Sequence, residues 1–139
     1  MKIKIKKITK NAVIPKYAKD GDAGIDLTVT EVNRLDREHI QYSFGLANEI
    51  PKGYVGYLFP RSSCYKAHQL LSNCVGVIDS GYRGELKAVF IGTQFDTCYK
   101  IGDRAVQLII MPIPFIELVE VEELSETERG SGGFGSTGK

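Results

Sequence analysis

The last eleven residues, 129–139, combine glycines with hydroxyl, arginine and phenylalanine side chains in one short segment. Glycine-rich backbone can approach a phosphate closely and turn its N–H groups toward it. Arg129 can clamp a phosphate through two hydrogen bonds, and the ring of Phe134 offers a flat face on which a base can stack. The same composition is also typical of a disordered terminus, so this segment alone leaves both interpretations open.

A second candidate is Asp79, which ends the apolar run 74–78 and precedes a Ser-Gly turn. We interpret this region as a β-hairpin with a carboxylate at the mouth of its loop. A carboxylate in such a place can accept a proton from an attacking water, although an aspartate entering a turn is more often a turn former. By the same default, Tyr82 and Arg83 are surface and interface residues.

Four further polar residues interrupt apolar strands or follow them. In residues 59–63 a proline stops a strand, and Arg61 and Ser62 then lead into a predicted helix, where an anion can bind. An ordinary N-cap with a surface arginine is the alternative. Asp26 is either a salt-bridge partner or an outer-shell metal group. Gln107 is either functional or a polar residue on an open sheet face.

Composition excludes some classes of partner. The chain has 139 residues, the size of one domain, with 42% hydrophobic and 25% charged residues. A net charge of +1 argues against a broad surface for nucleic acid or membrane. Any phosphate site must therefore be local.

Cysteine usage and the N-terminus indicate a cellular context. The three cysteines are odd in number and form no CxxC pair, which argues against a disulfide framework and a zinc site. The basic N-terminus has no apolar run behind it, and no segment approaches the roughly 18 apolar residues of a membrane span. We expect a soluble, intracellular, cytoplasmic protein.

The elements that must position these residues are mostly strands. Apolar residues alternate with polar ones or form short runs, and turns recur about every ten residues, which predicts an all-β sandwich or barrel. The predicted strands cover residues 3–5, 24–29, 40–47, 54–59, 74–78, 86–91, 105–111 and 115–121.

One stretch has helical spacing instead. Cys64, Ala67 and Leu71 fall on one helical face, so we predict a single short helix over 62–71 with Ser62 as its N-cap. The apolar pattern stops at Ser125. We therefore expect a β domain over 1–124 and a flexible arm over 125–139.

The combination and order of these segments are more specific than any one of them. The chain resembles the homotrimeric dUTPase family, whose five motifs match residues 23–27, 60–63, 76–84, 102–109 and 129–138 in that order. The resemblance implies a jelly-roll-like β domain and a homotrimer with shared active sites. In that family the C-terminal arm of one chain closes over a site built by the other two.

The resemblance also implies a reaction. The family hydrolyses dUTP to dUMP and pyrophosphate with Mg²⁺, which limits uracil incorporation into DNA and supplies dUMP for thymidylate synthesis. Asp79 would orient and activate the water that attacks the α-phosphorus. Tyr82 would pack against the deoxyribose and exclude a 2′-hydroxyl. Asn73 would read the uracil edge with backbone groups of the hairpin, and Val77 would belong to the same substrate-binding set.

The remaining motif residues are assigned to the phosphates by the same resemblance. Mg²⁺ would be held mainly by triphosphate oxygens and waters, with Asp26 acting indirectly through those waters. Phe134 would stack on uracil. The phosphate cradle would comprise Arg61, Ser62, Ser63 and Gln107. In the arm, Arg129, Ser136 and Thr137 would bind the distal phosphates, and Gly135 completes the substrate-binding set.

Two other functions compete with this one. The related dCTP deaminase branch needs a glutamate on the strand after motif three, whereas residues 86–90 contain no acid. A binding or regulatory module that uses the nucleotide as a switch is the second. Such proteins can carry an added segment between motifs three and four, and none is evident between Glu85 and Gly102. A regulatory role in addition to catalysis stays open.

Overall fold

The computed structural model describes residues 1–92 and 98–133. This part of the chain consists of short β-strands and one 3₁₀ helix of six residues. The elements are β1 (Lys4–Lys7), β2 (Ile25–Thr28), β3 (Glu31–Arg34), β4 (His39–Ser43), β5 (Leu46–Glu49), β6 (Tyr54–Pro60), the helix η1 (Ser62–Ala67), β7 (Gln69–Leu71), β8 (Gly76–Ile78), β9 (Lys87–Gly92) and β10 (Arg104–Pro112).

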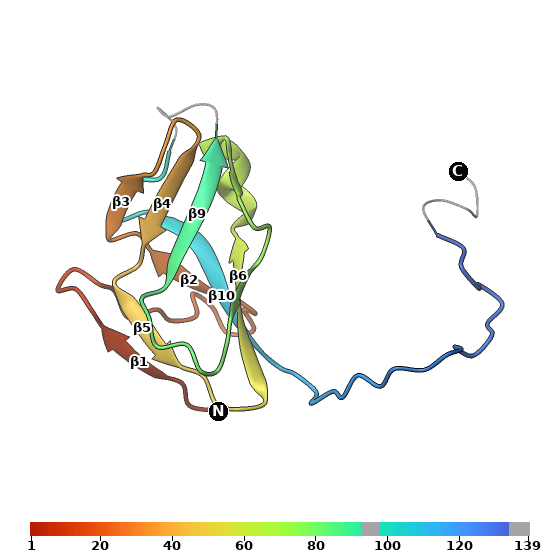
Figure 1. Ribbon diagram of the computed structural model, residues 1–139. Helices are drawn as coiled ribbons and strands as arrows, with labels where there is room; N and C mark the ends of the chain where they lie inside the picture. Colours follow the sequence, from red (N-terminus) through yellow and green to blue (C-terminus); the bar gives the residue numbers. More distant parts are fainter. Residues whose placement is uncertain (93–97, 134–139) are drawn as a thin grey trace.

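Two antiparallel four-stranded sheets form the layers of a sandwich (Figure 1). One sheet has the strand order β2-β10-β6-β8 and the other has the order β3-β4-β9-β7, while β1 and β5 form a separate pair. Apolar side chains of both sheets meet between the layers. This arrangement confirms the predicted jelly-roll-like all-β fold. None of the helices in the described part of the chain is long and apolar enough to cross a lipid bilayer.

An aromatic cluster occupies one end of the core. The rings of Tyr42, Phe90 and Tyr99 lie edge to face, with centroids 5.5, 5.6 and 5.7 Å apart. The hydroxyl of Tyr42 donates a hydrogen bond to Oε1 of Gln69 at 2.8 Å. Burial raises the pKa of Tyr42 and of Tyr99 above the ordinary tyrosine value.

These raised pKa values predict a loss of stability in alkali. Above about pH 10 the unfolded chain releases phenolic protons that the folded chain retains, so the free energy of unfolding falls as the pH rises. Each tyrosine contributes at most about 1.4 kcal/mol per pH unit. Chemical denaturation from about pH 8 to about pH 11 measures this slope.

Substitution separates the buried tyrosine from an exposed one. Tyr42→Phe should make the slope shallower, whereas Tyr17→Phe should leave it unchanged because Tyr17 is 54% exposed. Equal slopes for the wild-type protein and Tyr42→Phe would contradict the explanation.

The predicted helix is shorter than expected and has a different cap. Residues 62–67 form the 3₁₀ helix η1, its N-cap is Arg61 rather than Ser62, and no side chain caps it. His68 then adopts a left-handed conformation with φ of 49°, which ends the helix. The rest of the predicted helix is the strand β7, in which buried Gln69 and Leu71 flank exposed Leu70.

Several strands match the prediction closely, and others do not. The predicted strand over 40–47 is divided into β4 and β5 at Gly45, whose φ is +64°. The strands β3 and β7 were not predicted. Residues 74–91 are not a β-hairpin, because β8 pairs with β6 whereas β9 pairs with β4 and β7. The eight residues between them pass from one sheet to the other, too many for a tight hairpin turn.

The strand predicted over 115–121 is wrong for the isolated chain. The last backbone hydrogen bond to the sandwich runs from Ile113 N to Gly53 O at 2.9 Å. Beyond it the chain extends away from the sheets (Figure 1). Phe115 is 99% exposed and Leu118 is 90% exposed, because none of the strands that the structure describes lies beside them. The division of the chain at residue 124 stays a prediction.

Candidate active site

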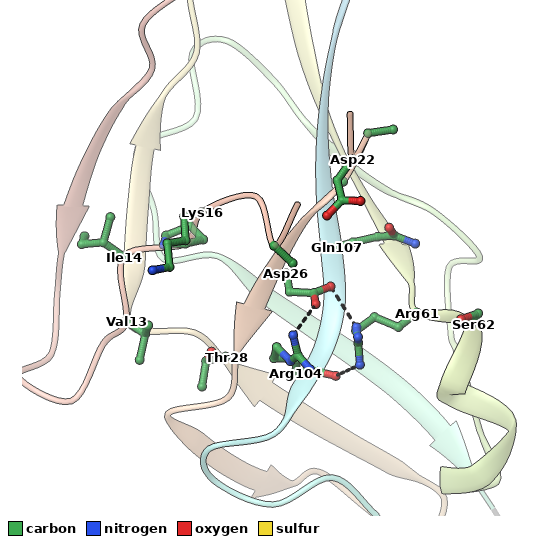
Figure 2. Close-up of a pocket in the computed structure, with 14 residues that line it drawn as sticks. Val13, Ile14, Lys16, Asp22, Asp26, Thr28, Arg61, Ser62, Arg104 and Gln107 are labelled. Atoms are coloured by element: carbon green, nitrogen blue, oxygen red, sulfur yellow. Dashed lines mark hydrogen bonds and ion pairs between the residues drawn. The ribbon is translucent and has the colours of Figure 1, made fainter. Parts of the chain in front are cut away.

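The sheet β2-β10-β6-β8 brings most of the candidate phosphate-binding residues together. Gln107 on β10 is paired with Asp26 on β2 and with Phe59 on β6. Arg61 and Ser62 follow the end of β6. These side chains, except that of Phe59, line a pocket of about 500 Å³ at this edge of the sandwich (Figure 2).

A charged network lies at the centre of this pocket. Arg61 donates from Nε to Oδ1 of Asp26 at 2.8 Å, and Arg104 approaches Oδ2 of Asp26 at 3.1 Å (Figure 2). The Asp26 side chain is only 22% exposed, so both carboxylate oxygens are paired where burial would otherwise penalise the charge. Two guanidinium groups against one carboxylate leave a net positive charge. The pocket is therefore suited to an anion.

Gln107 packs closely against Gly24, the residue just before β2. Its Nε2 donates to the carbonyl oxygen of Pro60 at 3.2 Å. Its side-chain oxygen lies so close to Gly24 that a Cβ at that position would clash with it. A side chain in place of the glycine of motif one would therefore displace the glutamine of motif four, although the two motifs lie far apart in the sequence.

The side chains of this pocket do not by themselves form a metal-binding site. The described residues contain no group of three or more His, Cys, Asp or Glu side chains placed for an ion. Asp26 and Asp22 both line the pocket of about 500 Å³, and both oxygens of Asp26 are already paired to arginines. This arrangement fits a hydrated cation that arrives on the phosphates of a ligand and meets Asp26 through water.

A second cluster lies in the loop 79–86. Val77, Asp79 and Tyr82 line a pocket of about 140 Å³, and Val77 is 60% exposed. The Tyr82 hydroxyl donates to the carbonyl oxygen of Glu85 at 2.9 Å, and its ring lies so close to Gly84 that a Cβ there would clash. Arg83 folds back to donate to two carbonyl oxygens of its own loop. Asp79 and Tyr82 thus line the same exposed pocket.

The two clusters lie at opposite ends of β6. Ile78 is paired with Gly56 near the start of that strand, and the antiparallel register places Asp79 beyond it, away from Arg61. Six residues of extended chain separate the two positions along β6, which corresponds to roughly 20 Å. One chain therefore does not bring Asp79 to the pocket that contains Arg61 and Asp26.

Other predicted residues lie apart from both clusters. Asn73 lines a separate pocket of about 280 Å³ with Lys87, which also borders the Asp79 pocket. Ser63 lies on the other side of Arg61 and accepts a hydrogen bond from it at 3.4 Å. Arg129 is exposed and donates to the carbonyl oxygen of Gly132 at 3.0 Å. The remaining predicted arm residues, Phe134, Gly135, Ser136 and Thr137, lie outside the described part of the chain.

Two residues of this region were missed by sequence reasoning. Arg104 pairs with Asp26, and Glu85 accepts a hydrogen bond from Gly45 N at 3.0 Å. Both are charged residues beside strand ends, which by default are solvated. The available signal was their position, because Arg104 lies within motif four and Glu85 directly follows motif three.

Comparison with known proteins agrees with this geometry. The dUTPase family model matches residues 10–138. The chain is 44% identical over 142 residues to the deoxyuridine 5′-triphosphate nucleotidohydrolase of Nautilia profundicola, with full coverage of both chains. It is 43% identical over 141 residues to the protein of the same name from Clostridium kluyveri, covering 99% of each.

Solved structures give the same result. The structure of the Staphylococcus bacteriophage 80alpha dUTPase G164S mutant with dUpNHpp superposes with a TM-score of 0.88. Sequence identity is 30%, and 99% of each chain is covered. The fold, the order of the five motifs and the full-length matches agree, and the chain belongs to the dUTPase family.

Proposed function

We propose that this protein hydrolyses dUTP to dUMP and pyrophosphate. Relatives that match its full length are named deoxyuridine 5′-triphosphate nucleotidohydrolases. The observation that carries the proposal is the cationic pocket in which Arg61 and Arg104 flank Asp26 beside Gln107. Such preorganised donors stabilise the charge of a phosphate chain in the transition state. In the cell this reaction would limit uracil incorporation into DNA and supply dUMP for thymidylate synthesis.

We further propose that the active enzyme is a homotrimer with shared active sites. The separation of roughly 20 Å between Asp79 and Arg61 along β6 supports this, because a second chain must supply one of the two clusters. The exposed apolar residues beyond Pro112 support it as well. Phe115, Leu118 and Leu124 are each at least 87% exposed in one chain, and a neighbouring subunit would bury them.

The loop 79–86 would then bind the nucleoside and activate water. The Asp79 carboxylate would accept a proton from the water that attacks the α-phosphorus. The ring of Tyr82, held over Gly84 by its hydrogen bond to Glu85, would pack on the deoxyribose and exclude a 2′-hydroxyl. Val77 and Asn73 would contact the base.

The cationic pocket would bind the triphosphate. Arg61, Ser62 and Gln107 would donate to phosphate oxygens, with Ser63 placed beside Arg61. Enzymes of this family generally depend on a divalent metal ion. We propose Mg²⁺, which when bound neutralises charge on the phosphates. Asp26 would orient its water shell while remaining paired to Arg61 and Arg104.

The C-terminal arm, residues 125–139, would close the site. Phe134 would stack on the uracil ring. The distal phosphates would be bound by Arg129, Ser136 and Thr137, together with the backbone at Gly135. Closure would exclude bulk water and fix the geometry of attack.

A substrate panel tests the proposed function. Pyrophosphate release is measured with dUTP, dTTP, dCTP and UTP in the presence of Mg²⁺, with EDTA-treated samples as the control. We expect rapid turnover of dUTP alone, because the base pocket and Tyr82 would exclude the thymine methyl, the cytosine edge and the 2′-hydroxyl. Comparable turnover of all four nucleotides would contradict the proposed specificity.

A further inference from the structure

The loop 79–86 is attached to the sandwich mainly at its C-terminal end. Leu86 N donates to Leu46 O at 2.7 Å, and Phe44 N donates to Leu86 O at 3.2 Å. Between these two bonds, Glu85 Oε1 accepts a hydrogen bond from Gly45 N at 3.0 Å. The Glu85 side chain is only 18% exposed. The Glu85 side chain therefore adds a third hydrogen bond to an attachment that is otherwise made by backbone groups.

The donor at Gly45 is held rigidly. Gly45 has a φ of +64°, and a Cβ at this position would clash with the Thr9 hydroxyl. Its carbonyl oxygen accepts a bond from Ile8 N at 2.7 Å. The backbone at the corner between β4 and β5 is thus fixed. The N–H of Gly45 therefore points in one direction, toward the Glu85 carboxylate.

The same glutamate reaches the substrate-facing side of the loop. Its carbonyl oxygen accepts the hydrogen bond from the Tyr82 hydroxyl at 2.9 Å, and its Oε2 lies 3.3 Å from Lys87 Nζ. The middle of the loop is held by bonds within itself, such as Tyr82 N to Asp79 O at 3.0 Å. These bonds connect Asp79 to Tyr82 and Tyr82 to Glu85, so the placement of Asp79 and Tyr82 depends on how the ends of the loop are fixed.

We propose that Glu85 is a positioning residue for the reaction proposed above, and this inference rests on that proposed function. Its side chain links the loop that carries Asp79 and Tyr82 to the rigid corner at Gly45. Without this link the loop shifts relative to the cationic pocket of the neighbouring chain. A displacement of about 1 Å from the productive geometry is enough to cost on the order of a hundredfold in rate.

Three substitutions separate the reach of the side chain from its charge. Glu85→Ala removes the acceptor for Gly45 N–H, and we expect kcat for dUTP to fall about 30- to 100-fold with KM within about threefold. Glu85→Gln keeps an oxygen at the same reach, so it should recover most of the wild-type kcat. Glu85→Asp keeps the charge but is too short, so it should resemble Glu85→Ala. Glu49→Ala removes an exposed glutamate that pairs with Lys4 at 3.0 Å, and it serves as the matched control.

Binding stoichiometry distinguishes positioning from a loss of folded enzyme. Calorimetric titration with dUpNHpp should give Glu85→Ala the same number of sites per chain as the wild-type protein. A stoichiometry that falls in proportion to kcat would overturn the proposal, as would wild-type kcat in Glu85→Ala. Rescue by Glu85→Asp but not by Glu85→Gln would overturn it too, because charge rather than reach would then matter.

The wild-type measurement keeps the two proposals apart. If the wild-type protein hydrolyses dUTP and Glu85→Ala is equally fast, only the positioning role is lost. If the wild-type protein fails to hydrolyse dUTP, the proposed function itself is wrong.

Discussion

Replacing Asp79 with asparagine is expected to lower kcat for dUTP by about 10²- to 10⁴-fold while binding stays within a few-fold of wild type. The amide has almost the shape of the carboxylate but cannot accept the proton of an attacking water. The loop should keep its conformation, because Asp79 supports the turn through its backbone carbonyl, which accepts a bond from Tyr82 N at 3.0 Å. The side chain is exposed, so the free energy of unfolding should change little.

Steady-state kinetics and dUpNHpp titration of Asp79→Asn measure these two effects separately. The control is Asp36→Asn, which makes the same chemical change in the turn between β3 and β4. Asp36 accepts bonds from the backbone of Glu38 and His39, which lower its pKa, and it also contacts the His39 ring, so its described contacts are all within its own turn. Near-normal turnover by Asp79→Asn would remove Asp79 from the proposed role.

Removing residues 129–139 is expected to lower kcat/KM for dUTP by about a hundredfold or more. The truncated protein would lose Arg129 and Phe134, and its site would stay open to water. Folding should be preserved, because residues 113–131 are exposed and contribute nothing to the core of their own chain. Thermal denaturation and size-exclusion chromatography of the 1–128 protein check this second expectation.

Two smaller changes show how much of the effect of the truncation comes from single residues. Phe134→Ala in the full-length chain removes one aromatic ring, and we expect a loss of about 1–3 kcal/mol of binding, the usual contribution of one stacked base. Deletion of Lys139 alone should have little effect. Full activity of the 1–128 protein would show that the arm is not part of the site.

Much of the sandwich could be predicted from local pattern. Strands such as β6 and β10 are bounded by turn residues and have apolar residues on the faces that pack in the core, and their bounds lie close to those predicted. Turn chemistry alone could not reveal that β8 and β9 join different sheets. Strand pairing depends on partners far away in the sequence, and β9 finds its partners in β4 and β7.

The errors have a common cause. The helical spacing over 62–71 is real, but pairing with β9 and burial of Gln69 and Leu71 favour a strand over 69–71. Residues 115–121 are rich in apolar side chains, as in a strand, yet no strand within residues 1–92 and 98–133 pairs with them. In both places tertiary contacts, or their lack, decided between conformations that local sequence allows.

By itself, the sequence determined which chemical groups the protein carries and the order of the five motifs, and these already indicated the dUTPase family. Only the tertiary structure decided which of those groups lie together within one chain and which lie far apart. Sheet register, which is set by non-local hydrogen bonds, places Gln107 between Asp26 and Phe59 and directs Asp79 to the far end of β6. It also gives Glu85 its contact with Gly45, which is possible only because backbone from two distant segments meets at that corner.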